Sequence, residues 1–148
     1  VYYLQNEVAF GEIVRGMHHW GASLVIVMMF LHTLRVFFTG SYKKPRELNW
    51  MVGVLIFAVM LGLGFTGYLL PWDMKALFAT KVGIEIAASV PVIGGMIKTL
   101  LAGDETIIGA QTLTRFFAIH VFFLPAALFS LLAAHFIMIR RQGISGPL

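Results

Sequence analysis

The sequence has no cysteine and few charged residues: only 12% of its 148 residues are Asp, Glu, Lys or Arg. The absence of cysteine excludes disulfides, thiolate metal sites and covalent thioether links to a prosthetic group. Soluble domains contain about 25% charged and about 45–50% apolar residues, whereas 59% of this chain is hydrophobic and its mean hydropathy is +0.85. The composition therefore excludes a water-soluble globule and a disordered chain.

Two further features are missing from the sequence. The net charge of +4 comes from dispersed basic residues, so no basic patch of the kind that binds nucleic acid is present. The first residues, Val1–Glu12, lack a basic region followed by an apolar core, which argues against a signal peptide. Because the chain begins with Val1 rather than Met, we expect a fragment or a processed product.

Long apolar stretches are abundant. Three of them lie near residues 16–38, 50–70 and 115–139, and about 20 apolar residues are enough to cross a hydrocarbon core of about 30 Å as a helix. In lipid the backbone polar groups must be paired within the segment, which favours helices. We therefore predict an all-α membrane protein whose single domain, residues 1–148, has three transmembrane helices. Two short surface helices are expected in the long link within 74–112.

The charges predict how the helices are oriented. The short loop after the first stretch carries Lys43, Lys44 and Arg46 against Glu47, and the end of the third stretch carries Arg140 and Arg141. Three alternating helices place both basic segments on the same side of the membrane. Short Lys/Arg-rich loops stay in the cytoplasm, so we assign these segments to the negative (n) side. The long link then lies on the positive (p) side.

Histidines are the most informative residues of the sequence. His18 and His32 are 14 residues apart in the first stretch, and His120 and His135 are 15 apart in the third. Each spacing is close to four helical turns, with a rise of about 21–22 Å, so each pair lies roughly on one helix face. Ionisable residues at membrane depth are costly and need a functional partner. Because the first and third helices run parallel, His18 should meet His120 near the p side, and His32 should meet His135 near the n side.

Two imidazoles facing each other at one depth are the axial ligands of a six-coordinate haem. The four histidines therefore predict two stacked b-type haems, which need no cysteine. A lone membrane histidine more often makes a helix–helix hydrogen bond or serves as a proton site, but two pairs at matched depths are hard to obtain by chance. His19 lies about 100° around the helix from His18 and is interpreted as an interfacial residue.

Glycines and arginines supply weaker candidates for cofactor binding. Gly53 and Gly67 are also 14 residues apart and would let the backbone approach a flat group at each level, although ordinary small-residue helix packing is the favoured explanation when the glycines are considered alone. Arginine can pair with a haem propionate in a bidentate manner. Arg35 could instead extend to the lipid headgroups. The candidates for propionate binding are Arg15, Arg35, Arg115 and Arg140.

At these residues the chain resembles cytochrome b of the bc-type quinol-oxidising complexes, and most of all its short cytochrome b6 form. The resemblance covers essentially the whole chain and rests on four stretches: RGMHHWGASLVIVMMFLHTLRVFFTGSYKKPREL, GFTGYLLPWD, TLTRFFAIH and HFIMIRRQGISGPL. The 15-residue histidine spacing favours the b6 form. The family has four helices in this subunit, and Val1–Glu12 resembles the segment just after the first, so the first helix is expected to be missing.

The resemblance implies a redox subunit of a quinol:cytochrome c or plastocyanin oxidoreductase in a bacterial plasma membrane or thylakoid. Electrons would pass from p-side quinol through the haem of His18 and His120, then the haem of His32 and His135, to n-side quinone. The p-side quinol pocket would include the region around Gly109–Arg115. Implied partners are a Rieske iron–sulfur protein, a c-type cytochrome and a second-half cytochrome b subunit resembling subunit IV, in a homodimeric complex.

Some parts of the family pattern are absent. The b6 form tethers a third haem through a cysteine of the first helix, and this chain has none. The acidic quinol-site motif belongs to the partner half, so no catalytic residue is assigned and the chain alone is not expected to oxidise quinol. Two alternatives are a dihaem membrane anchor of a dehydrogenase or hydrogenase, against which the PWD turn and the long link argue, and a helical scaffold without cofactor.

Overall fold

A computed structural model describes residues 1–103 and 108–144. Throughout this described part every regular element is a helix, which confirms the predicted all-α class. The elements are α1 (Tyr2–Asn6), α2 (Gly11–Phe38), α3 (Glu47–Leu69), α4 (Met74–Ala88), α5 (Gly94–Ala102), α6 (Ala110–Ala118), a π-helical turn η1 (Ile119–Phe123) and α7 (Leu124–Gln142).

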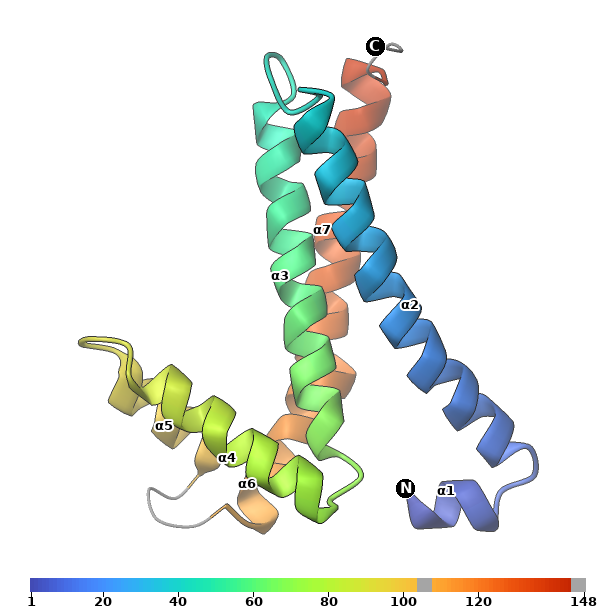
Figure 1. The fold of residues 1–148 in the computed structure, drawn as a ribbon, viewed down its shortest axis with the longest axis vertical. Helices are drawn as coiled ribbons and strands as arrows, with labels where there is room; N and C mark the ends of the chain where they lie inside the picture. Colours follow the sequence, from blue (N-terminus) through green and yellow to red (C-terminus); the bar gives the residue numbers. More distant parts are fainter. Residues whose placement is uncertain (104–107, 145–148) are drawn as a thin grey trace.

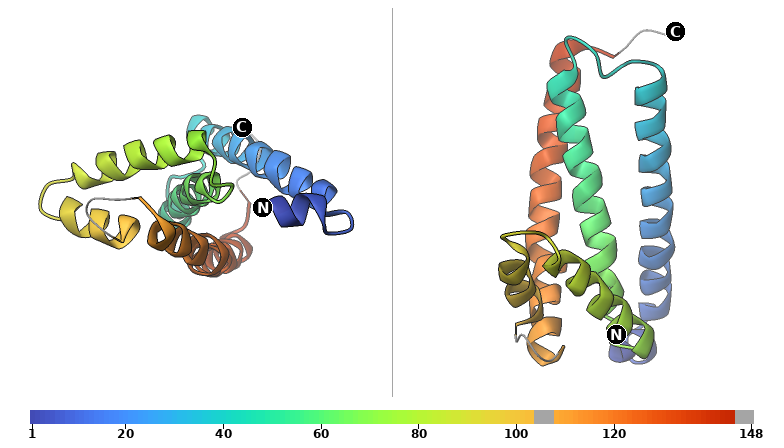
Figure 2. Two further views of the ribbon diagram at one scale, coloured as in Figure 1. Left: turned by 90° about the horizontal axis from the view of Figure 1, so that it is seen from below. Right: turned by 60° about the vertical axis from the view of Figure 1, so that its left-hand side comes forward.

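Three long helices form the body of the molecule (Figure 1). Segments Gly11–Phe38, Glu47–Leu69 and Ala110–Gln142 are long and apolar enough to cross a membrane, as the sequence predicts. The first and third segments begin earlier than expected, because helix continues outward past the apolar residues. Helices α2 and α7 run in the same direction, α3 runs in the opposite one, and α3 packs against both (Figures 1 and 2).

The turn after α3 is determined by three consecutive residues. Pro71 cannot donate a backbone hydrogen bond, and the helix ends two residues before it. Trp72 adopts a positive φ of 58° and donates its backbone N–H to the carbonyl of Leu69. The Asp73 carboxylate then caps α4 by accepting a hydrogen bond of 2.8 Å from the backbone N–H of Ala76. The PWD sequence thus turns the chain from α3 into α4.

Helices α4, α5 and α6 gather at one end of the bundle, away from the loop between α2 and α3 (Figures 1 and 2). They bury a small apolar core against the end of α3, formed by Leu69, Ala76, Ile84, Ala102 and Phe116. The long link therefore folds back on the bundle as two helices, α4 and α5, before the last membrane segment begins.

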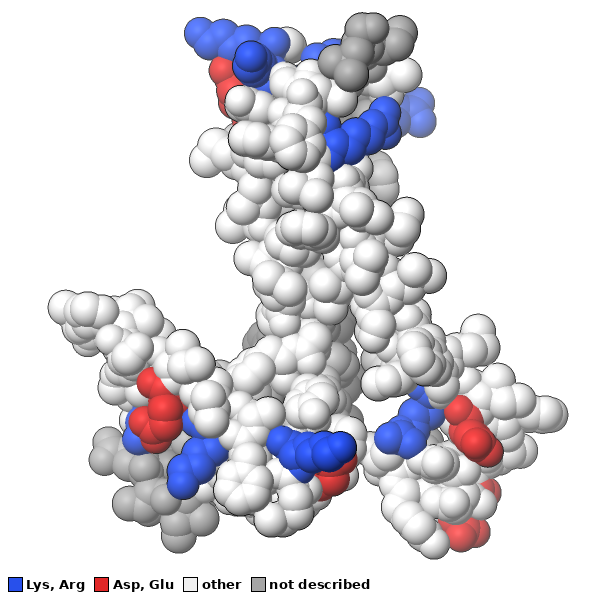
Figure 3. All heavy atoms as spheres, in the orientation of Figure 1, with Lys and Arg blue, Asp and Glu red and all other residues white. Residues whose placement is uncertain are grey.

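Charged residues gather at the two ends of the bundle. On the face shown, the central part of the bundle carries no charged residue (Figure 3). Helix α2 is almost uncovered: within it only Gly11 is buried. Large exposed apolar side chains follow its length, including Trp20, Leu24 and Phe30. Such a surface suits lipid or another apolar partner, not water.

Arg115 links the end of α5 to α6. Its guanidinium donates hydrogen bonds of 2.7 Å to the carbonyls of Thr99 and Leu100 in the last turns of α5, and the carbonyl of Thr99 also accepts from the backbone N–H of Gly103. A charge-assisted hydrogen bond contributes about 1.5–3 kcal/mol. We expect Arg115→Gln to speed backbone amide exchange in residues 94–102 by about tenfold or more, measured by hydrogen exchange.

The control for Arg115→Gln is Lys98→Ala. Lys98 forms an ion pair of 2.9 Å with Glu85, whose side chain is 55% exposed, and an exposed pair contributes about 0–1 kcal/mol. Its loss should change exchange little. If Arg115→Gln released a haem and left exchange in α5 unchanged, the helix-capping role would be wrong and propionate binding would be favoured.

Candidate functional site

The structure places His18 of α2 beside His120 of η1. Their ring centroids are 6.2 Å apart and the ring planes are nearly perpendicular, at 84°. Because η1 directly follows α6, this pair lies toward the end of the bundle that carries α4 to α6 (Figure 1). The ring of His19, in contrast, packs edge-on against its neighbour Trp20.

The ring of His120 lies directly against the backbone of α3. A Cβ added to Gly67 would come within 2.6 Å of His120 Cε1, closer than real side chains approach, so only glycine leaves room for the ring. On the same stretch of α3, the Thr66 hydroxyl lies 3.1 Å from His120 Nδ1. At the other level a Cβ on Gly53 would meet His135 Cε1 at 3.5 Å, an ordinary contact distance. Both predicted glycines therefore contact a histidine of the last segment.

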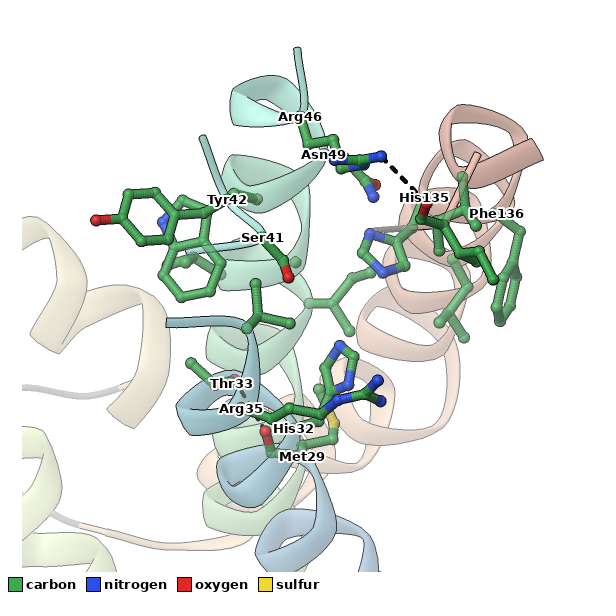
Figure 4. A pocket seen from close by; sticks show the side chains of 18 of the residues that line it. Met29, His32, Thr33, Arg35, Ser41, Tyr42, Arg46, Asn49, His135 and Phe136 are labelled. Carbon is green, nitrogen blue, oxygen red and sulfur yellow. Dashed lines mark hydrogen bonds between the residues drawn. The ribbon is translucent and has the colours of Figure 1, made fainter. Parts of the chain in front are cut away.

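His32 and His135 line one cavity of about 750 Å³ between α2, α3 and α7. Figure 4 shows His32 coming from α2 and His135 from α7, with their rings projecting into this space. The volume lies within the 300–1,000 Å³ range of cofactor and ligand sites. Most of the lining is apolar and includes Val25, Met29, Val54, Leu128 and Leu132. The cavity lies toward the basic loop, at the opposite end from the His18–His120 pair.

The predicted arginines take different positions. Arg35 lines the cavity one turn beyond His32 (Figure 4). Arg15 pairs with the side chain of Gln5 in α1, and Arg115 binds the carbonyls of α5. Arg140 is exposed in the last turn of α7. Of the four, only Arg35 lines the cavity of His32 and His135.

Arg46 and Asn49 are two polar lining residues that were not predicted. Arg46 reaches the cavity from the basic loop and donates a hydrogen bond of 3.2 Å to the carbonyl of Ile144, just past α7 (Figure 4). Asn49 lies one turn further, in α3, and its Oδ1 is buried without a hydrogen-bond partner. The signal for Arg46 in the sequence is the basic loop, which predicts the orientation of the helices and also contributes to this cavity.

The π-helical turn Ile119–Phe123 contains His120. The backbone N–H of Leu124 bonds to the carbonyl of Ile119, five residues back, as expected for a single turn with one extra residue. Over 15 residues an unbroken α-helix rotates about 60° beyond four turns. Because the π-helical turn accommodates one extra residue, His120 and His135 take the relative rotation about the helix axis that an unbroken α-helix gives over 14 residues. That rotation is about 40° short of four turns. This is the relative rotation of His18 and His32 on α2.

Comparison with known proteins identifies the family. Residues 23–148 match the family described as Cytochrome b(N-terminal)/b6/petB. The chain belongs to this family. Cytochrome b membership and the three apolar helices together make the chain an integral membrane protein.

Individual cytochrome b relatives extend over the whole chain. The menaquinol:cytochrome c reductase cytochrome b subunit of Bacillus subtilis is 86% identical over 148 residues, which are 100% of this chain and 66% of that protein. Cytochrome b6 of Synechocystis is 49% identical over 148 residues, again 66% of the relative. A chain of a hyperthermophilic respiratory Complex III superposes with a TM-score of 0.87 at 31% identity, covering 99% of this chain and 40% of that chain. The chain thus spans just under two thirds of the curated relatives it matches.

The residues present fit the haem that the cytochrome b family implies. A metal bonded to two imidazole nitrogens at about 2.0–2.1 Å each separates the ring centres by about 6 Å, and the centroids of His18 and His120 are 6.2 Å apart. The described part of the chain has no group of three or more His, Cys, Asp or Glu able to hold a metal. A porphyrin would supply the remaining ligands of a metal held between paired histidines.

Proposed function

We propose that the chain holds two b-type haems as the electron-transferring core of a quinol:cytochrome oxidoreductase of the bc or b6f type. His18 and His120 would bind the p-side haem iron, and His32 and His135 the n-side haem iron. The observation that carries this proposal is the 6.2 Å separation of the His18 and His120 rings, with Gly67 in contact with His120. The second histidine pair lines a cavity of suitable volume four turns further along.

The chain's own residues supply axial ligands, apolar walls and cations. The histidines would present imidazole nitrogens to the iron, and the side chains of α2, α3 and α7 would exclude water. Arg35 and Arg46 line the n-side cavity, where a guanidinium would pair with a propionate carboxylate. A bound haem supplies one-electron redox chemistry, and its potential depends on axial ligands, nearby charge and burial.

Electrons would cross the membrane from quinol on the p side to quinone on the n side, with proton release and uptake on the corresponding sides. The distribution of charge supports the orientation: Lys43, Lys44 and Arg46 of one loop lie at the same end of the bundle as Arg140 and Arg141 (Figures 1 and 3). Basic ends of this kind stay in the cytoplasm or stroma. The membrane would be a bacterial plasma membrane or a thylakoid.

Other subunits would complete the quinol site. The names of the relatives, a menaquinol:cytochrome c reductase subunit and a cytochrome b6, support a Rieske iron–sulfur protein, a c-type cytochrome and a subunit IV-like second half as partners. The complex would be a homodimer. Because the chain carries the ligands and not the acidic quinol-site motif, it should not turn over quinol alone.

A dithionite-reduced minus oxidised spectrum of the detergent-purified protein, with haem stoichiometry, tests the proposal. We expect two non-covalent b-type haems per chain, each with the α-band of a six-coordinate haem. A single haem, a covalently attached haem or none in a folded protein would contradict it. The experiment uses protein isolated from the membrane in which its complex is assembled.

A further inference from the structure

Thr66 lies between two hydrogen-bonding groups. It is only 5% exposed, although it belongs to a membrane-spanning helix with few buried residues. Its Oγ1 is 2.8 Å from the carbonyl oxygen of Gly62 and 3.2 Å from that of Leu63, both on α3. The same oxygen is 3.1 Å from Nδ1 of His120. The hydroxyl therefore connects the backbone of α3 to a histidine of the last membrane segment.

The tautomer of His120 determines the direction of these bonds. A threonine hydroxyl has one proton to donate and lone pairs that accept. When Nε2 of a neutral His120 ring is the metal ligand, Nδ1 carries the proton, so Oγ1 accepts from Nδ1. The hydroxyl proton then goes to the carbonyl oxygen of Gly62 or Leu63, which can only accept. In a neutral imidazole this arrangement leaves Nε2 unprotonated, with its lone pair available to a metal.

We propose that Thr66 is a positioning residue that holds His120 in the Nδ1–H tautomer and fixes its ring orientation toward the p-side haem iron. This inference rests on the proposed function. Gly67 gives the ring room on α3, and the neighbouring hydroxyl fixes its rotation about the Cβ–Cγ bond. Hydrogen bonds to the non-ligating nitrogen of a metal-bound histidine orient the ring and raise its basicity as a ligand.

The n-side histidine of the same segment has different surroundings. Each ring lies beside a backbone carbonyl of α3, that of Leu63 for His120 and that of Asn49 for His135, but only His120 has a side-chain partner as well. No threonine hydroxyl reaches Nδ1 of His135. The two predicted haem sites thus differ in what orients the histidine of the last membrane segment. Removing the Thr66 hydroxyl should therefore affect only the p-side site.

The test compares Thr66→Val with Thr66→Ser in the complex purified from its native membrane. Valine keeps the branched shape and removes the hydroxyl, whereas serine keeps the hydroxyl. Ser130→Ala is the matched control, since Ser130 donates to the carbonyl of Ala126 on α7 in the same way and is exposed. The readouts are haem per chain under increasing competition from a haem-binding apoprotein, and low-temperature EPR of the oxidised complex, which resolves the two ferric haems.

With T66V, the p-side EPR signal should shift or broaden, and the affinity for that haem should fall about 10-fold to 100-fold, the usual effect of losing such a partner. The n-side signal should stay unchanged, and T66S and S130A should resemble the unsubstituted protein. Thr66→Ala, which adds no atom, makes the same comparison if T66V does not accumulate.

Two results would overturn the inference. One is unchanged EPR and retention of both haems in T66V, and the other is an equal loss in T66S and T66V. Failure of the proposed function gives a distinct result, because the unsubstituted protein itself would then lack two haems.

Discussion

His32→Ala is expected to remove the n-side haem and to leave the p-side haem in place. Each haem would be attached through only two axial ligands, and the partner of His32 across the cavity is His135. The other ligand pair lies four turns away, about 21 Å along α2, so its geometry does not depend on His32. The haem content should fall from two per chain to one, because an open axial position weakens binding and admits other ligands.

Haem stoichiometry and EPR of the oxidised protein measure this result, and His18→Ala should give the converse pattern. His19→Ala is the matched control, because His19 is the neighbour of His18 but stacks on Trp20 outside the pair. It should retain both haems. If His32→Ala accumulated with its full haem content, the assignment of His32 and His135 as one ligand pair would be wrong.

The three membrane helices could be read from the sequence because lipid leaves few options for the backbone. Long uncharged runs such as residues 50–70 have to be helical in a bilayer. Parallel directions for α2 and α7 followed from the number of spans alone. The histidine spacing then indicated which residues should meet.

The π-helical turn could not be predicted in this way. The sequence predicts a regular helix through His120, in which the 15-residue spacing to His135 exceeds four turns by about 60°. A signal was present in Pro125, which lacks a backbone N–H and whose ring crowds the carbonyl four residues earlier. A proline inside a helical run indicates a local change of winding, but the sequence does not tell whether this becomes a kink or an added residue.

Arg115 and Arg46 show the limit of reasoning from distance along the chain. Arg115 was considered for propionate binding because it lies five residues before His120, but its guanidinium binds α5 carbonyls. The return of α5 against α6 depends on packing through Phe116 and Ala102, which no local pattern encodes. Arg46 is distant from both histidines in the sequence and still lines their cavity, because the loop folds over the helix ends.

Gly67→Ala should release the p-side haem while Gly53→Ala retains both haems. The added methyl carbon at position 67 would lie 2.6 Å from His120 Cε1 and 3.2 Å from Nε2, so the ring has to move. Overpacking of this kind costs about 1–3 kcal/mol. The displaced ring would carry Nε2 away from the position opposite His18, and the 6.2 Å ring separation would be lost.

Gly53→Ala makes the same chemical change on the same helix at the other haem level. Its methyl would meet His135 Cε1 at 3.5 Å, an ordinary contact that needs no displacement. Both alanines also favour helix formation by about 1 kcal/mol over glycine, so helix propensity cannot account for a difference between them. EPR of each ferric haem, with haem per chain, compares the two variants. Equal haem loss in both would mean that general helix packing explains these glycines, and loss from Gly67→Ala alone would show that position 67 must be glycine because His120 lies against it.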